Sequence, residues 1–217
     1  MHIREMILSA AVFIASLTVM DARPRLRSCD LVFVSESLSS EDSSMDKAIT
    51  LATGDPETMS FTHVAIVERR WMRLWVIDAS PRHGVARRRF SEFLKEQEGP
   101  GVHLAVKRLR TMRGLSRRDI LRNAESYLWQ SYDFTFMPDN GMMYCSELVR
   151  ESYRDRQGRY IFDAAPMNFL APDGSLPEYW HELFESIETE VPQGVPGTNP
   201  QDMSQSPLLE TVTTFTL

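Results

Sequence analysis

Two apolar segments separated by only a few residues constrain the fold of this chain most. Residues 61–68 and 74–79 are rich in β-branched and aromatic side chains, which is typical of strands. The short arginine-rich stretch between them, Arg69 to Arg73, predicts an antiparallel hairpin. Apolar residues occupy both faces of each strand, so we expect the hairpin to lie in a sheet that is covered on both sides.

Shorter segments of both kinds surround this hairpin. Further strands are predicted at 30–34, 85–89 and 102–109, and helices at 45–52, 90–97 and 177–185. Another helix begins at Ser116, which stands three residues before Asp119 as in a capping box. Because strands and helices are mixed with few signs of parallel crossovers, we expect an α+β domain with a small antiparallel sheet.

The length of the chain favours one domain. Its 217 residues, 42% of them hydrophobic, are enough for a single core, which we assign to residues 23–190. Residues 191–217 contain several prolines and glycines and show neither a helical nor a strand period. They are predicted to form an extended C-terminal arm.

The N-terminus resembles a secretory signal peptide. An apolar run at residues 6–20 follows Arg4 and is shorter than the ~20 residues of a membrane-spanning helix. Glu5 offsets the charge of Arg4 and no clean cleavage site precedes Arg23, so an uncleaved anchor and a buried first helix stay open. We expect residues 1–22 to direct export to the periplasm or the extracellular space.

The charge of the chain argues against nucleic acid as a partner. The net charge is -6, and the basic runs Arg87 to Arg89 and Arg117 to Arg118 are interpreted as solvated surface. Two cysteines are too few for a disulfide scaffold, although an oxidising compartment could pair Cys29 with Cys145.

Cys145 is the first candidate for a reactive group. It follows the turn-rich run 137–141 and stands where the pattern becomes that of an amphipathic helix. The backbone N–H groups and the dipole at a helix start stabilise a thiolate, the nucleophilic form of cysteine. Leu148, Val149 and Ser152 continue an apolar stripe from Cys145, so a buried structural cysteine is the alternative.

The hairpin supplies a base and a carboxylate. If Ile66 pairs with Trp75, the same register sets His63 opposite Asp78 on one face, within hydrogen-bonding reach, whereas a slip of one residue separates them. A thiol hydrolase needs a base for the thiol and a group that orients the base, and Cys145, His63 and Asp78 suit these roles. The structural alternative is that the imidazole bonds a backbone carbonyl and the carboxylate bonds local N–H groups.

Three more residues are candidates for contacts with the reacting group. The backbone N–H of Cys145, helped by the hydroxyl of Tyr144 or Tyr132, could hold an oxyanion. Tyr132 equally suits a packed loop anchor. Glu147 is a candidate substrate contact, although a Glu in the first helical turn is more often a surface group that complements the dipole.

The segments around the three candidates resemble a known family. Thr-His-Val-Ala-Ile-Val around His63, Val-Ile-Asp-Ala around Asp78 and Tyr-Cys-Ser-Glu-Leu-Val around Cys145 are similar to circularly permuted NlpC/P60 cysteine hydrolases of the YiiX/YebB type, in which the Cys follows the His. The similarity extends over most of the chain after residue 29, including residues 191–200.

The resemblance implies a papain-like core in which the nucleophile helix packs on an antiparallel sheet that carries the His. It also implies thiol-dependent amide hydrolysis or acyl transfer without a metal or an organic cofactor. Two positions depart from the family. Cys29 stands where Gly is expected, so an altered tight turn and a second thiol near the site are expected there, and Asp78 stands where Glu is common. His83, His103 and His181 show no metal-ligand spacing, in line with no metal site.

Several functions are compatible with these residues. The leading prediction is a cysteine amidase that acts on a small peptide or an N-acyl amino acid, such as a fragment of cell-wall peptide. A lipid acyltransferase or lipid hydrolase is the runner-up, because Met142, Met143, Phe134 and Phe136 could line an acyl groove or belong to the core. A non-catalytic binding module on the same fold is the third. We expect contact with a membrane only through the N-terminal signal.

Overall fold

The structure is a computed structural model that describes residues 25–36, 44–54 and 59–217. The segment predicted to be a signal peptide, residues 1–22, lies outside the described residues. Within the described ranges, no helix is long and apolar enough to cross a membrane.

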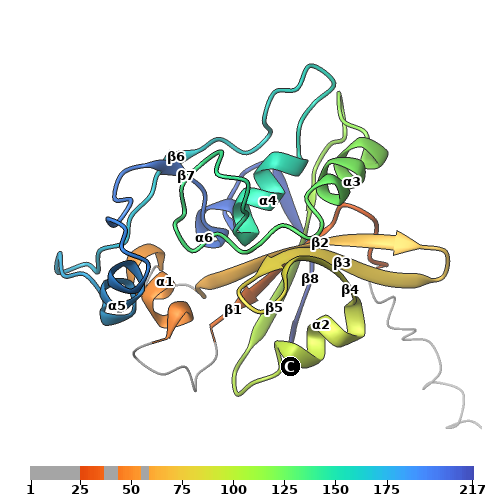
Figure 1. Ribbon diagram of the computed structural model, residues 1–217. Helices are drawn as coiled ribbons and strands as arrows, with labels where there is room; N and C mark the ends of the chain where they lie inside the picture. Colours follow the sequence, from red (N-terminus) through yellow and green to blue (C-terminus); the bar gives the residue numbers. More distant parts are fainter. Residues whose placement is uncertain (1–24, 37–43, 55–58) are drawn as a thin grey trace, which may run out of the picture.

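A six-stranded antiparallel sheet forms the centre of the molecule (Figure 1). Its strands run in the order β4, β3, β2, β1, β5, β8, and each pair of neighbours is antiparallel. Their bounds are Leu31–Ser35 for β1, Phe61–Arg70 for β2, Arg73–Ser80 for β3, Gly84–Arg89 for β4, His103–Leu109 for β5 and Leu209–Thr216 for β8. The predicted α+β class with an antiparallel sheet is confirmed, as are the strands expected around residues 31, 61, 74, 85 and 103.

Helices cover both faces of this sheet, as the apolar character of both strand faces predicts. On one face Leu31, Phe33 and Ile66 pack with α3 (Arg117–Ser126) and α4 (Cys145–Ser152) in the larger core cluster. On the other face Val32 and Ala65 pack with α2 (Phe90–Glu96). Figure 1 shows α2 on the opposite side of the sheet from α3 and α4.

The remaining elements lie beside the sheet. Helix α1 (Met45–Thr53) packs against α5 (Glu178–Ser186), and β6 (Ala165–Pro166) and β7 (Pro196–Gly197) form a separate two-stranded ribbon. The starts of α1 and α3 follow capping rules, since Ser44 Oγ accepts from Lys47 N at 3.2 Å and Ser116 Oγ accepts from Asp119 N at 3.3 Å.

The register of the β2–β3 hairpin differs from the predicted one by two residues. Ile66 pairs with Ile77, not with Trp75, and the pair that closes the hairpin is Arg70 with Arg73. The turn is therefore centred one residue later than expected, at Trp71 and Met72. Because side chains alternate with a period of two, a shift of two residues keeps every side chain on its predicted face.

The C-terminal residues 191–217 are not a separate arm. They contain α6 (Pro200–Ser204) and β8, and β8 pairs with β5 along its whole length. The side chain of Gln201 accepts a hydrogen bond from the backbone N–H of Phe61 at 2.9 Å, which ties α6 to β2. The boundary predicted at residue 190 therefore falls inside one sheet-centred domain. A periodicity argument fails here because β8 is a half-exposed edge strand rich in threonine.

Candidate active site

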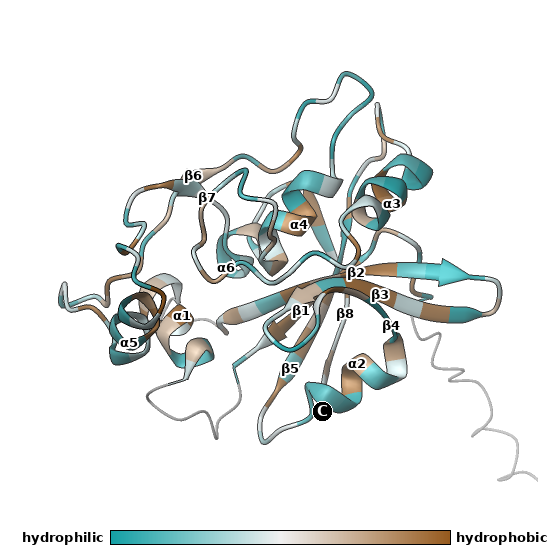
Figure 2. Ribbon diagram, viewed as in Figure 1, coloured by the Kyte–Doolittle hydropathy of each residue, from teal (hydrophilic) through white to brown (hydrophobic). Residues whose placement is uncertain are grey.

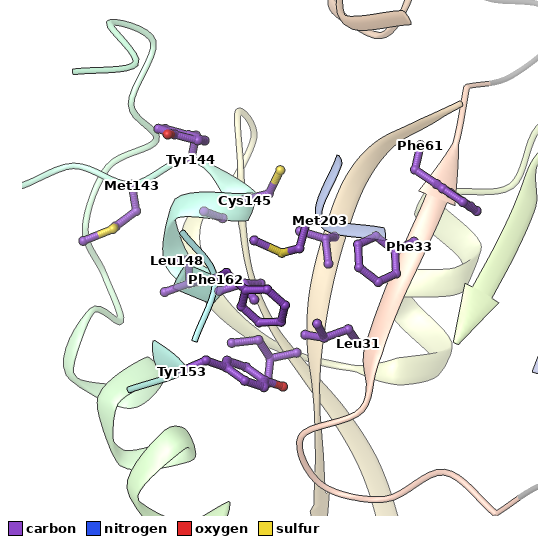
Figure 3. Packing of buried hydrophobic residues seen from close by; sticks show 14 of the residues in the cluster. Leu31, Phe33, Phe61, Met143, Tyr144, Cys145, Leu148, Tyr153, Phe162 and Met203 are labelled. Atoms are coloured by element: carbon purple, nitrogen blue, oxygen red, sulfur yellow. The ribbon is translucent and has the colours of Figure 1, made fainter. Parts of the chain in front are cut away.

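Cys145 is the first residue of α4, as predicted, and it is 6% exposed. Figure 3 shows its sulfur directed away from Leu148 and Tyr153, which lie further along the helix toward Leu31. Tyr144, the N-cap residue, makes no capping hydrogen bond with its side chain. Both predicted properties of the position thus occur together: the helix stripe is buried, and the thiol stands at a helix start.

His63 and Asp78 meet, although they do not face each other directly across the hairpin. His63 Nε2 lies 2.9 Å from Asp78 Oδ2, and the Asp78 side chain is 0% exposed. Continuing the observed register would set His63 opposite Ser80 and Asp78 opposite Ala65. The contact is therefore the diagonal one between residues of the same face, which long side chains can bridge.

The Cys145 side chain lies close enough to His63 to affect its pKa. Burial by itself lowers the pKa of His63. The hydrogen bond to Asp78 and the hydrogen bond and charge of Cys145 outweigh this effect and raise the pKa to about 10. Since Nε2 bonds the carboxylate, Nδ1 is the nitrogen left for the thiol. The site thus favours the protonated imidazole beside the Asp78 carboxylate.

Arg88 completes this group of charges, and sequence reasoning missed it. The Arg88 guanidinium donates to Asp78 Oδ2 at 2.7 Å and to Oδ1 at 3.3 Å, and it also bonds Glu96. Burial raises the pKa of Asp78, but the hydrogen bonds and charges of His63 and Arg88 outweigh it, so this pKa lies below its usual range.

The interpretation of residues 87–89 as solvated surface was therefore wrong for two of the three arginines. Arg88 is 8% exposed, and Arg87 bonds Glu68 and Glu125. The available signal was the burial expected for Asp78, because a buried carboxylate requires a partner. In the observed register Arg88 stands opposite Val76, diagonal to Asp78 on the same face.

The two candidate tyrosines differ in how their hydroxyls are used. Tyr132 is buried and lies close enough to Cys145 to interact with its charge, and burial raises its pKa well above the usual value. Its hydroxyl has one weak partner, Met45 Sδ at 3.8 Å. The Tyr144 hydroxyl accepts from the backbone N–H of Thr198 at 3.2 Å. The Tyr144 hydroxyl also donates to Met167 Sδ at 3.8 Å, so the two tyrosines are alike as donors, and Tyr144 differs in that it also anchors a neighbouring segment.

Glu147 points away from the cleft, so it does not stand where a substrate contact would be. Helical residues are 100° apart, so Glu147 lies 200° around α4 from Cys145. It is also not a surface group, since it is 8% exposed. Burial, and then the charge of Asp133, raise the pKa of Glu147 to about 8, against the effect of a hydrogen bond from the Tyr144 backbone N–H. Glu147 therefore caps the nucleophile helix from behind.

An apolar cleft opens at Cys145. Its walls come from α1, the 132–136 loop, α5 and the C-terminal residues, and they include Ile49, Tyr132, Phe136, Phe169, Trp180 and Thr198. Of the four residues considered for an acyl groove, only Phe136 lines it; Met143 is buried elsewhere in the core. A second, polar hollow lies on the His63 side and is lined by Asp46, Glu96 and Glu98. Thr62 borders both hollows.

The C-terminal segment supplies part of the site that sequence reasoning did not assign. Ser146 Oγ donates to the carbonyl of Thr198 at 3.0 Å, which fixes this segment against α4. A Cβ on Gly197 would come within 2.4 Å of Met167 Sδ and 2.8 Å of the Tyr144 hydroxyl. A larger residue at position 197 would thus have to displace the Met167 and Tyr144 side chains, a constraint that appears only once the segment is packed.

Cys29 is remote from the site and chemically different from Cys145. Both thiols are free, and Cys29 lies at the far end of α4, where its carbonyl accepts from Tyr153 at 3.0 Å. Burial raises the pKa of Cys29 to about 12. Its backbone φ of 66° is the left-handed conformation for which Gly was expected at this position, so the tight turn forms in spite of the substitution.

The model of a family described as permuted papain-like amidase enzymes, YaeF/YiiX, C92 family, matches residues 26–213. The chain belongs to this family. The predicted kinship with permuted papain-like enzymes of the YiiX type is thereby confirmed, and the protein is a cysteine hydrolase of the amidase and peptidase type. The relation to NlpC/P60 stays a prediction. No curated protein sequence matches the chain significantly.

A solved structure supports the fold of this C92 family member. The crystal structure of the metalloprotein yiiX from Escherichia coli O157:H7 aligns with a TM-score of 0.66 and 24% identity, over 90% of this chain and 99% of that one. The word metalloprotein applies to that protein. In residues 25–36, 44–54 and 59–217 of the present chain, no three His, Cys, Asp or Glu side chains are grouped to hold a metal ion, so the described donor set does not fit a metal centre.

Proposed function

We propose that this protein hydrolyses an amide bond of a small peptide or N-acyl amino acid, with Cys145 as nucleophile, His63 as general base and acid, and Asp78 as the group that orients His63. The observation that supports the proposal is the 2.9 Å contact of the His63 imidazole with a fully buried carboxylate, on an imidazole close enough to Cys145 for the thiol to affect its pKa. Export of the protein, from its N-terminal residues, is part of the proposal.

The order of steps follows from these contacts. The thiolate attacks the carbonyl carbon, and the oxyanion accepts hydrogen bonds from the backbone N–H of Cys145 and the hydroxyl of Tyr132. His63 Nδ1 then gives its proton to the leaving nitrogen, and the amine departs from an acyl-enzyme thioester. A water molecule, deprotonated by His63, attacks the thioester, and the carboxylic acid and the thiolate are released.

Asp78 and Arg88 explain why the imidazole keeps its role through both steps. The carboxylate fixes the ring through Nε2 and stabilises the imidazolium. The two guanidinium bonds fix the carboxylate in turn. Because Arg88 also bonds Glu96, the whole chain of charges is anchored to α2 on the far side of the sheet.

The two hollows favour an orientation of the substrate. The apolar cleft lies on the Cys145 side, where the acyl group stays during the reaction, so it suits an aliphatic or aromatic acyl group. The hollow with Asp46 and Glu98 lies on the imidazole side, where the amine leaves. A product amine is protonated at neutral pH, and carboxylates stabilise it there.

Lipid acyl hydrolysis or transfer is the second candidate. The aromatic lining of the cleft, with Phe136, Phe169 and Trp180, favours it, because a fatty acyl chain would be accepted by the same surface. The two functions share the thioester and differ in the acceptor and the leaving group.

A substrate screen with the Cys145→Ala variant tests the proposal. We expect N-acyl amino acids and short peptides with apolar acyl groups to be hydrolysed by the native protein, and the rate to fall by at least about a thousandfold in the variant. The small void left by one sulfur keeps the fold nearly intact, which circular dichroism checks. A Cys29→Ala variant is the matched control and should keep full activity, because its thiol is buried at the far end of α4.

Trapping separates the two candidates. Under acid quench, native protein with an N-acyl amino acid should carry the acyl mass on the peptide containing Cys145, and phospholipid should leave it unmodified. Labelling from phospholipid alone would instead assign the lipid reaction. Full activity in the Cys145→Ala variant would falsify the mechanism for both.

A further inference from the structure

The tip of the β2–β3 hairpin exposes two large apolar side chains. Trp71 is 96% exposed and Met72 is 86% exposed, and they form the two-residue turn between the closing pair Arg70 and Arg73. Figure 1 shows the hairpin projecting past the helices that cover the sheet. An exposed Trp and Met side by side at a protruding tip are the kind of apolar surface that marks a contact with a partner.

Arginines flank this tip on both strands. Arg69 and Arg70 precede the turn and Arg73 follows it, and Figure 2 shows the strands changing from hydrophobic to hydrophilic toward the tip. Arg70 has one weak contact, 3.4 Å from Glu68, and in the described part of the chain Arg69 and Arg73 form no ion pair. The carboxylate of Glu68 is already bonded by Arg87 at 2.7 Å. The tip is therefore positive on a protein whose net charge is -6.

The start of the described chain adds to the same region. Ser28 Oγ accepts a hydrogen bond from the Arg69 backbone N–H at 2.9 Å, so Arg25 and Arg27 precede a residue that touches the hairpin. The nearby carboxylate, Asp30, is bonded by Arg108 at 2.6 Å. Residues 1–24, which include the apolar run 6–20, are attached to the chain at this end.

From these observations we infer that the hairpin tip docks on an anionic lipid surface, with Trp71 and Met72 in the interface and Arg69, Arg70 and Arg73 against the headgroups. Trp is the side chain best suited to the boundary between headgroups and acyl chains, and arginines pair with anionic headgroups. This contact is additional to the N-terminal one that the sequence predicts, and it does not depend on the proposed function.

Docking at the tip would hold the active site away from the membrane surface. His63 and Trp71 stand near opposite ends of β2, and the rise of a strand puts them about 26 Å apart. A tethered enzyme of this shape presents its cleft to material beyond the headgroups, which fits a soluble or cell-wall amide better than a bilayer lipid.

Vesicle binding by the full-length chain tests the inference. We expect sedimentation with vesicles of phosphatidylcholine plus phosphatidylglycerol, weaker sedimentation with phosphatidylcholine alone, and loss of binding as salt rises. Trp71→Asn with Met72→Ser should weaken binding by about tenfold, and Arg69→Gln with Arg70→Gln and Arg73→Gln by roughly a hundredfold. Asn is chosen because Trp71 has a φ of 56°, which Asn tolerates.

Matched controls separate the hairpin from the N-terminal segment, which is present in every variant. Trp129 is also exposed, at 89%, and has a φ of 78°, so Trp129→Asn should bind as the native protein does. Three exposed arginines elsewhere, Arg82, Arg122 and Arg159, provide a charge-matched triple Gln variant, which should also retain binding.

Fluorescence gives an independent readout. Brominated lipids should quench the native protein and quench Trp71→Asn much less. Hairpin variants that bind as tightly as the native protein would overturn the inference. So would a concentration-dependent dimer in sedimentation velocity that the hairpin substitutions abolish, because a second copy of the chain would then be the occupant of the tip.

Discussion

Charged side chains lie in opposite environments at the two ends of β2. At the His63 end the charges are buried and paired with one another: the imidazole, Asp78 and Arg88 form one connected group in which the carboxylate is 0% exposed. At the other end Trp71 and Met72 lie in solvent, and Arg69 and Arg73 lack an ion-pair partner among the described residues.

This difference indicates whether the side chains at each end interact within the molecule or with an external partner. Buried ions need partners within the molecule, because transfer out of water costs several kcal/mol for each unpaired ion. Exposed apolar and cationic side chains have no such need, and they are available to a partner outside it. One strand thus links a site of internal chemistry to a surface of external contact.

The largest effect expected from breaking this contrast is at Asp78. Asp78→Asn keeps the shape of the side chain but removes the charge that orients and stabilises the imidazolium, so we expect the hydrolysis rate to fall about a hundredfold to ten-thousandfold. The loss should appear in kcat more than in KM. His63 is protonated below its pKa of about 10, so this form is lost as pH rises through that value.

The pH profile distinguishes orientation from simple unfolding. Without the Asp78 carboxylate the pKa of His63 falls, and the alkaline limit of activity should move to lower pH in the Asn variant. An unchanged alkaline limit with reduced activity would mean that Asp78 acts on the fold and not on the imidazole.

A smaller effect is expected from Glu147, a buried carboxyl that forms no ion pair within the described part of the chain. The pKa of Glu147 is about 8 in the folded protein and about 4.3 in the unfolded chain. The contribution of the neutral carboxyl to the free energy of unfolding is therefore fully present below about pH 4.3 and is lost as pH rises through about 8. Glu147→Gln keeps an acceptor for the Tyr144 N–H and removes this loss. The variant should be more stable than the native protein by about 1 kcal/mol or more at pH 8, measured by urea unfolding.

The difference in free energy of unfolding between Glu147→Gln and the native protein should widen from pH 5 to pH 8. Glu182→Gln, at an exposed position of α5, is the control and should leave the pH dependence unchanged. Equal stability of Glu147→Gln and the native protein across this range would show that the carboxyl is not held neutral.

The smallest effect should come from the exposed end of β2. Trp71→Asn with Met72→Ser removes no internal contact of note, so we expect the free energy of unfolding to change by less than about 0.5 kcal/mol. Turnover of a soluble substrate should be unchanged, because the site lies near the other end of the strand. A large loss of turnover in solution would break the separation of the two ends.

The sequence by itself determined the elements and much of the face pattern. Period-two and period-3.6 patterns indicated five of the six strands of the sheet and the start of α4 at Cys145, because local alternation reflects which side of an element is buried. His63 and Asp78 were assigned to one face despite a register error of two residues. That parity survives any even shift, so it did not require the correct turn.

Tertiary structure decided what depends on contacts between distant segments. Arg88 reads as a surface residue until β4 is aligned with β3, and Gly197 and Thr198 belong to an irregular segment whose place against α4 no local pattern encodes. Strand β8 likewise carries no strong alternation, since its edge position leaves much of it in solvent. Local sequence specifies which face of an element avoids water, whereas partners far apart in the chain are fixed only when packing brings them within a few ångströms.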